Sequence, residues 1–258
     1  MSTWTRPSCA RLSHPSPADV TAAVARGPLH TRVIAVGLSN TGTSTLSAIL
    51  MRLGCCLLAK TPRSRLFYPA NVSADCAYNP KLPNPQCEAQ VLREAPRYQC
   101  VVDLPWVTHW RALTAADPAA YVVLTRSRSA VDYALSVRHF YTSPRYDYAG
   151  SGLTLNQQSW MESKHRPWEN VSALIARYET HLMEVRAAMR GRRRYFEVCF
   201  MCGDDLLTVA RSLQLDTERM RLDEGSSAVR ANAHKSDPTA DVDFVRKYAS
   251  YLIQGASN

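Results

Sequence analysis

Long apolar runs are missing from the 258-residue sequence, which argues against a membrane-spanning protein. No stretch reaches the length of about 20 apolar residues that a helix needs to cross a bilayer. The N-terminus also lacks the apolar core of a secretory signal peptide. We therefore expect a cytoplasmic protein without a transmembrane segment. Residues 1–18 are rich in Ser, Thr, Arg and Pro and contain no acid, so an organellar transit segment stays open beside a short disordered tail.

Cysteines are too few to form a disulfide scaffold, because only eight occur in a chain of this length. Cys199 and Cys202 have CxxC spacing, but no second CxxC or nearby pair of histidines completes a zinc site. We expect these two residues to be thiols of a buried strand, and we expect no metal. Cys76 and Cys87 could pair only in an oxidising compartment, and we expect them to be thiols as well.

Acidic residues are in deficit, since 31 Lys and Arg face 22 Asp and Glu and give a formal net charge of +9. This balance favours an anionic partner such as a nucleotide, a sulfated or phosphorylated substrate, a nucleic acid or a membrane surface. The arginines are scattered except at 190–194, and aromatic residues do not interleave with them. We therefore expect no nucleic-acid binding.

No internal repeat or linker divides the sequence, and its hydrophobic content of 46% and charged content of 21% are typical of a globular protein with a core. We expect an N-terminal tail at 1–30 and a single α/β domain at 31–258. The sequence leaves the oligomeric state open.

Strand-like and helix-like segments alternate along this domain. Residues 32–36 are apolar and mostly β-branched, as in a buried parallel strand, and residues 43–53 follow with helical spacing of their apolar residues. Further strands are expected at 100–102, 121–125 and 195–200, further helices at 106–116, 129–140, 168–189 and 206–213, and long loops at 59–97 and 141–167. This order predicts a three-layer, doubly wound parallel sheet.

Ligands of such sheets bind outside the carboxyl ends of the strands. Gly37, Asp103 and Arg126 all follow predicted strands directly, so we expect them to lie at one edge of the sheet. The sequence thus predicts a ligand site at this edge.

The segment Gly-Leu-Ser-Asn-Thr-Gly-Thr-Ser-Thr-Leu at 37–46 lies between the first strand and the first helix. Its two glycines allow the backbone to turn its N–H groups toward one point, and the helix N-terminus adds partial positive charge. This pattern predicts a P-loop-type phosphate site. A Walker A loop would have lysine where Thr43 stands, which argues against a kinase or NTPase.

Three segments together resemble the PAPS-dependent sulfotransferases. The stretch from Val33 to Leu46 resembles their 5′-phosphosulfate loop, which has Gly-Thr-[Ser/Thr] where kinases have Gly-Lys-[Ser/Thr]. Val-Val-Asp-Leu-Pro-Trp at 101–106 resembles their Asp-x-Pro strand end. Residues 121–136 resemble the strand, loop and helix that bind the 3′-phosphate of PAPS through an arginine and a serine eight residues later. The resemblance covers roughly residues 32–215.

The resemblance implies a sulfotransferase that moves a sulfuryl group from its co-substrate PAPS to a hydroxyl or amine of a small-molecule or carbohydrate acceptor. Arg128 and Ser136 have the spacing of the 3′-phosphate pair, and Arg126 is a second phosphate contact. Asp103 is the candidate general base, and His109 is the alternative. The residues implied on the 5′ side are Ser39, Asn40, Thr41, Gly42, Thr43, Ser44 and Thr45.

Asn40 departs from the family pattern, because most relatives have Lys or Arg there, in contact with the bridging oxygen and the 5′-phosphate. Another cation, such as Lys60, Arg63 or Lys235, could replace it. Otherwise the chain would be a catalytically silent relative that binds a nucleotide or a partner. A P-loop small-molecule kinase is the third and weakest alternative.

Overall fold

A computed structural model describes residues 31–55, 57–60, 85–142 and 170–215, together with five isolated residues, Ala18, Thr21, Leu29, Val72 and Cys76. These residues form a parallel five-stranded sheet in the order β2-β3-β1-β4-β5. The strands are β1 (Val33–Ala35), β2 (Leu58–Lys60), β3 (Cys100–Val102), β4 (Tyr121–Thr125) and β5 (Tyr195–Val198).

Strand β1 lies at the centre of the sheet, with β3 on one side and β4 on the other. Ile34 is in register with Val101 of β3 and with Val122 of β4. All residues of β1, β3 and β4 are buried, which is why their sequences read as continuous apolar runs rather than as alternating patterns. The predicted strands at these positions are confirmed.

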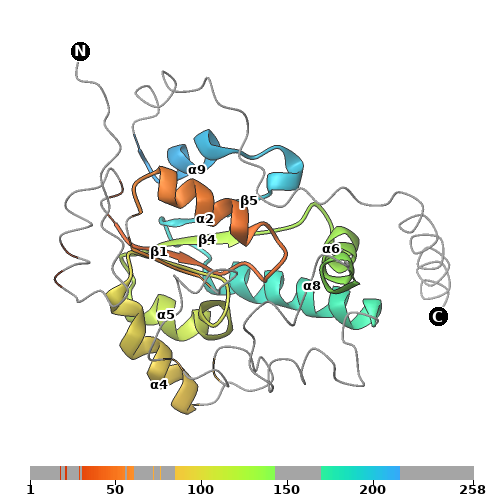
Figure 1. Ribbon diagram of the computed structural model, residues 1–258, viewed down its shortest axis with the longest axis horizontal. Coiled ribbons are helices and arrows are strands. Elements are labelled where there is room, and N and C mark those ends of the chain that lie inside the picture. The colour runs from red at the N-terminus through yellow and green to blue at the C-terminus, as the bar shows by residue number, and fades with distance from the viewer. Residues whose placement is uncertain are drawn as a thin grey trace.

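Helices cover both faces of the sheet (Figure 1). Helices α2 (Thr43–Arg52) and α9 (Leu206–Ser212) pack on the face to which Val33 and Ala35 point. Helices α4 (Pro85–Glu94), α5 (Trp110–Ala116) and α8 (Val171–Ala188) pack on the opposite face, which Ile34 and Val36 line. Successive strand residues alternate between the two faces, so each layer has its own core. The predicted three-layer α/β fold is confirmed.

Helix α6 (Ala130–Thr142) packs beside α8 rather than on the sheet itself. Tyr133 of α6 stacks on Tyr178 of α8, with ring centroids 4.6 Å apart and an interplanar angle of 16°. Burial raises the pKa of both tyrosines, so both remain neutral. This contact fixes the start of α6, which directly follows β4, against the layer of α8.

The region from 59 to 97 differs from the predicted loop, because it contains the end of β2, the helix α4 and a 3-10 turn at Ala95–Arg97. Helix α4 buries only Cys87, Val91 and Glu94, so its apolar periodicity is weak in the sequence. The predicted helix 106–116 is divided into the 3-10 helix η2 (Trp106–His109) and α5. Segments 61–71, 73–75, 77–84 and 143–167 of the predicted loops lie outside the described residues.

The expectation of thiols is wrong for four cysteines, which form the disulfides Cys76–Cys87 and Cys199–Cys202. A third disulfide, Cys55–Cys100, joins two cysteines for which no prediction was made from the sequence. Cys55 and Cys100 are 45 residues apart in the sequence, but the packing of α2 on β3 brings their Cα atoms within 6.4 Å. The spacing of cysteines in the sequence does not predict a disulfide between residues so far apart. Of the helices in the described part of the chain, none combines the length and apolar character needed to cross a bilayer.

Candidate functional site

The carboxyl ends of β1, β3 and β4 meet at one edge of the sheet, where Gly37, Asp103 and Arg126 follow them as predicted. Gly37 lies against the end of β4 so closely that a Cβ atom would be 1.9 Å from Thr125 Oγ1 and 2.5 Å from the Thr125 carbonyl oxygen. Only glycine fits there. The turn that leaves β1 is therefore held directly against β4.

The loop between β1 and α2 has two residues in the left-handed backbone region, Asn40 with φ 70° and Gly42 with φ 99°. Asparagine adopts this region more readily than most other residues, which gives Asn40 a conformational reason to be there. The Thr41 hydroxyl donates to the Leu38 carbonyl at 2.6 Å and lies 2.7 Å from Thr125 Oγ1. These contacts hold the loop in a compact turn at the end of the sheet.

Asp103 connects this loop to the end of β3. Its carboxylate accepts hydrogen bonds from the hydroxyls of Ser39 and Thr43, the latter at 3.0 Å, and from the Leu104 amide, also at 3.0 Å. Asp103 has a left-handed backbone as well, with φ 71°. The residue that caps the following 3-10 helix is Pro105, so helix capping does not explain this carboxylate. It organises the loop and the first residue of α2.

Helix α2 begins at Thr43, directly after the loop, and has no acidic residue in its first turn. Its N-terminus carries partial positive charge, which favours an anion at this edge of the sheet. Ser136 approaches the same loop from α6, where its hydroxyl donates to the Asn40 carbonyl at 3.3 Å. The structure therefore brings Ser136 together with the loop residues and Asp103.

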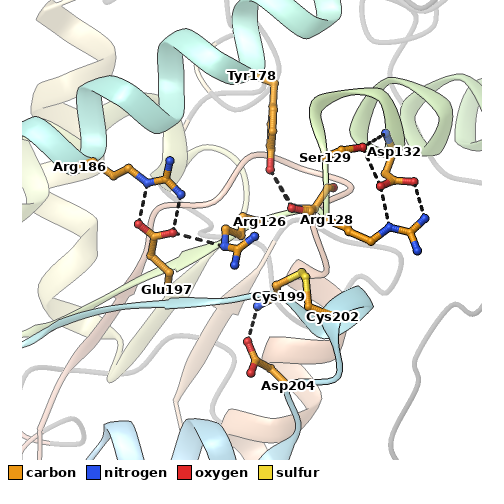
Figure 2. Close-up of a disulfide and its surroundings, with 11 residues drawn as sticks. Arg126, Arg128, Ser129, Asp132, Tyr178, Arg186, Glu197, Cys199, Cys202 and Asp204 are labelled. Carbon is orange, nitrogen blue, oxygen red and sulfur yellow. Dashed lines mark hydrogen bonds and ion pairs between the residues drawn. A yellow bond between two sulfur atoms is a disulfide. The ribbon is translucent and has the colours of Figure 1, made fainter.

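The two predicted phosphate-binding arginines are paired with carboxylates (Figure 2). Arg128 donates two hydrogen bonds of 3.0 Å to Asp132, and they lower the pKa of that carboxyl. Arg126 lies 3.4 Å from Glu197, to which Arg186 also donates hydrogen bonds of 2.8 and 2.7 Å. The bonds from Arg186 lower the pKa of Glu197. Both arginines thus lie near the strand ends, but one carboxylate, Glu197, serves both Arg126 and Arg186, so this cluster keeps a net positive charge. The buried Nε of Arg126 has no hydrogen-bond partner among the described residues.

A cavity of about 540 Å³ lies between the loop that follows β4 and helix α8. The Tyr178 hydroxyl bridges the Ser127 backbone there, accepting from its amide at 2.9 Å and donating to its carbonyl at 3.2 Å. The buried Ser127 hydroxyl has no hydrogen-bond partner among the residues that the structure describes. Arg126, Arg128, Arg186 and Arg190 line the same cavity, which gives it a polar, arginine-rich wall.

His109, the alternative base, is enclosed within the layer of α4 and α5. Its side chain is only 1% exposed, and its Nδ1 lies 4.0 Å from a carboxylate oxygen of Glu88 on α4. Burial lowers the pKa of His109. The described contact of this ring is with α4 rather than with the loop. By comparison, Asp103 is partly exposed at the strand ends.

His181 is a site residue that the sequence analysis missed. From α8 its Nε2 lies 2.6 Å from the carbonyl of Val36, the last residue before Gly37, and its ring packs edge-on against Trp110. Burial lowers the pKa of His181, so the neutral ring donates its Nε2–H to the carbonyl. The sequence pattern that could have identified His181 is its position three residues after Tyr178, which places it on the face of α8 that packs inward.

The lowered pKa of His181 predicts a loss of stability in acid. Below the ordinary histidine pKa of about 6.5, the unfolded chain binds a proton that the folded protein excludes, so the free energy of unfolding falls as the pH falls. One such proton gives a slope of at most about 1.4 kcal/mol per pH unit. We expect the free energy of unfolding in urea to differ less between pH 7.5 and pH 5.5 in His181→Gln than in the parent protein. Glutamine keeps an N–H donor for the Val36 carbonyl. Equal differences in variant and parent would contradict this assignment.

A family model described as a sulfotransferase domain matches residues 32–203, which are 172 of the chain's 258 residues. The chain belongs to the sulfotransferase family. The matched region runs from β1 to the 3-10 helix η3 (Phe200–Cys202) and contains the loop, Asp103, Arg126, Arg128 and Ser136. The resemblance stated from the sequence is thereby confirmed, and the reaction class of this family is sulfuryl transfer. No curated protein matches the sequence.

Metal-ligating side chains do not cluster in the described part of the chain, which contains no group of three or more His, Cys, Asp or Glu that could hold an ion. Of the cations named as substitutes at Asn40, Arg63 and Lys235 lie outside the described residues.

Proposed function

We propose that this protein transfers a sulfuryl group from PAPS to a hydroxyl or amine of a small-molecule or carbohydrate acceptor. One observation carries the proposal: the β1–α2 loop receives Asp103 from one side, through Ser39 and Thr43, and Ser136 from the other, through Asn40. Elements that the family uses for the two ends of one nucleotide thus meet at one loop. The match to the sulfotransferase domain supports the reaction class.

In this proposal the loop holds the 5′-phosphosulfate. Backbone amides of a glycine-bounded loop and the N-terminus of α2 favour an anion at this place, and the hydroxyls of the loop add further donors. Arg128 and Ser136 hold the 3′-phosphate, and Arg126 provides a second positive charge. Arg128 would exchange Asp132 for the phosphate. That exchange is easy because the Arg128 side chain is 65% exposed, and exposed ion pairs are weak.

The reaction breaks the bond between sulfur and the bridging oxygen of PAPS and forms one between sulfur and the acceptor oxygen or nitrogen. Charge develops on the leaving phosphate, where the loop donors and the helix N-terminus stabilise it. Asp103 takes the proton of the acceptor, because its carboxylate has a lone pair beyond those that accept from Ser39, Thr43 and Leu104. Its partial exposure favours it over His109, which is buried.

Asn40 supports a second candidate function, that of a catalytically silent relative that binds a nucleotide or a partner. An amide can donate a hydrogen bond to the bridging oxygen but brings no charge, and the loss of a charged contact costs on the order of a few kcal/mol in the transition state. Binding without turnover would then remain. Both candidate functions predict nucleotide binding, but only the first predicts transfer of the sulfuryl group.

The first test compares 3′,5′-adenosine bisphosphate with Mg-ATP by thermal shift and calorimetric titration. We expect the bisphosphate to stabilise the protein and Mg-ATP to bind more weakly, because Thr43 replaces the lysine of a kinase loop. We expect Arg128→Ala and Ser136→Ala each to weaken bisphosphate binding, by about tenfold for the arginine and by less for the serine.

Arg111→Ala is the matched control, since this exposed arginine pairs with Glu184 on the α5–α8 side of the molecule, away from the loop. Its bisphosphate affinity should equal that of the parent. Unchanged affinity in both site variants would move the 3′-phosphate elsewhere, and a preference for Mg-ATP would favour the kinase. Labelled-sulfate transfer to an acceptor panel then distinguishes the active sulfotransferase from the catalytically silent relative, because a total lack of turnover would favour the silent relative.

A further inference from the structure

The disulfide Cys199–Cys202 closes the turn that follows β5, at the same edge of the sheet as the β1–α2 loop (Figure 2). Its two cysteines are three positions apart in the sequence, and Cys202 is the last residue of η3. Asp204 reinforces the turn, because its carboxylate accepts a hydrogen bond of 2.7 Å from the Cys199 amide. The CxxC motif is therefore a crosslinked turn, and no step of the proposed sulfuryl transfer uses it.

Phe200, inside this disulfide ring, lies directly against the loop. A Cβ atom added to Gly42 would lie 2.7 Å from Cδ2 of Phe200, so the phenyl ring and the loop backbone are in close contact. Gly42 has the left-handed backbone and is the residue from which α2 starts. Phe200 also packs against the core under α2 and α9. The crosslinked turn thus supports the loop at the point where its backbone reverses.

Of the three disulfides in the described part of the chain, this one is the most open to a reductant. Cys55, Cys100, Cys76 and Cys87 are all buried, with exposed fractions of 7% or less. Cys199 is buried as well, but Cys202 is exposed. Because thiol–disulfide exchange requires a thiolate to reach a sulfur, an external dithiol meets Cys202 first.

We propose that Cys199–Cys202 is a thiol–disulfide exchange site whose oxidation state controls the shape of the β1–α2 loop. A dithiol attacks the Cys202 sulfur, the S–S bond breaks, and the Cys199 sulfur leaves as a thiolate that is then protonated. The second thiol of the reductant resolves the mixed disulfide, so the reductant is oxidised to its own disulfide and supplies two electrons and two protons. The products are two cysteine thiols in the turn.

Opening the crosslink releases the turn that holds Phe200 against Gly42. The loop then populates conformations that do not fit a phosphate. Its apparent affinity for a phosphate ligand equals the intrinsic affinity multiplied by the fraction of molecules with a competent loop. The oxidised protein is the form with the preorganised loop. The effect on a bound ligand rests on the proposed function, whereas the effect on the loop itself does not.

The test uses the full chain and a graded series of dithiothreitol, with alkylation and peptide mass analysis at each step. Cys199 and Cys202 should be labelled before Cys76 and Cys87. Hydrogen exchange of peptides covering 37–46 should then become faster in the reduced form, and the dissociation constant for 3′,5′-adenosine bisphosphate should rise about three- to tenfold. The double variant Cys199→Ser with Cys202→Ser should behave like the reduced protein without reductant.

Two comparisons make the result decisive. The double variant Cys76→Ser with Cys87→Ser removes another disulfide and should leave exchange of the loop unchanged. Phe200→Ala should give fast loop exchange in both redox states, and a remaining response to reductant would overturn the route through Phe200. Equal loop exchange in oxidised and reduced parent protein would overturn the proposal as a whole. Loop exchange that responds, with no bisphosphate binding in either state, would keep this proposal and reject the proposed donor.

Discussion

Replacing Gly37 with alanine is expected to destabilise the fold by about 3 kcal/mol, at the upper end for overpacking in a well-packed region. The added Cβ would lie 1.9 Å from Thr125 Oγ1, 2.5 Å from its carbonyl oxygen and 2.8 Å from its amide nitrogen. Two of these atoms belong to the backbone, so no side-chain rotation relieves the clash. The ends of β1 and β4 would have to separate, which also strains the 2.8 Å hydrogen bond from the Val36 amide to the Val123 carbonyl.

Urea unfolding followed by circular dichroism measures this effect, and Gly191→Ala is its control. Gly191 has a left-handed backbone with φ 79°, but a Cβ there would have nothing within 4 Å. Its substitution should cost only the backbone penalty, on the order of 1 kcal/mol. If alanine at 37 costs no more than alanine at 191, crowding against Thr125 is not what requires glycine.

Replacing Asp103 with asparagine is expected to reduce sulfuryl transfer by about 10²- to 10⁴-fold, the range of a lost general base. An amide oxygen still accepts a hydrogen bond from Ser39 or Thr43, so the loop should keep its shape and bisphosphate affinity should stay within a few-fold of the parent. Asp103→Ala removes both functions. We therefore expect it to lose turnover and to bind the bisphosphate clearly more weakly.

Labelled-sulfate transfer and bisphosphate titration, run on the same preparations, distinguish these effects. Asp117→Asn is a suitable control, because this carboxylate pairs with Arg32 at 2.9 Å just before β4 begins, at the opposite edge of the sheet. It should cost stability without a specific loss of turnover. Full turnover in Asp103→Asn would leave Asp103 as a positioning residue of the loop and would require another proton acceptor.

The elements nearest the site were the easiest to predict from the sequence. The strand 121–125 was placed with the bounds of β4, and the strand and helix around the loop were placed within one residue, because glycines and apolar runs mark their ends. Helix α4 was missed because few of its residues are buried, and β2 because three residues carry no pattern of their own. Local sequence patterns were thus sufficient for elements with many buried residues, and insufficient for a very short strand and a mostly exposed helix.

Within the site, the expected parallel sheet predicted that residues after the strands lie at one edge, but it did not predict their individual contacts. The carboxyl ends of parallel strands share one edge, so the approach of Asp103 to the loop followed from topology. The sharing of Glu197 by Arg126 and Arg186 depends on β4, β5 and α8 at once, and the sequence has no signal for contacts among three elements. The same is true of Cys55 and Cys100, whose pairing depends on how α2 packs on β3.

The central place of β1 has a consequence for synthesis of the chain. Its two neighbours begin at Cys100 and Tyr121, and the hydroxyl pair that fastens the loop joins Thr41 to Thr125, 84 residues apart. A nascent polypeptide that has not yet emerged past Thr125 therefore exposes an unpaired edge of β1 and lacks the hydroxyl contact that fastens the β1–α2 loop. Fragments that end before this threonine should not fold into the sheet.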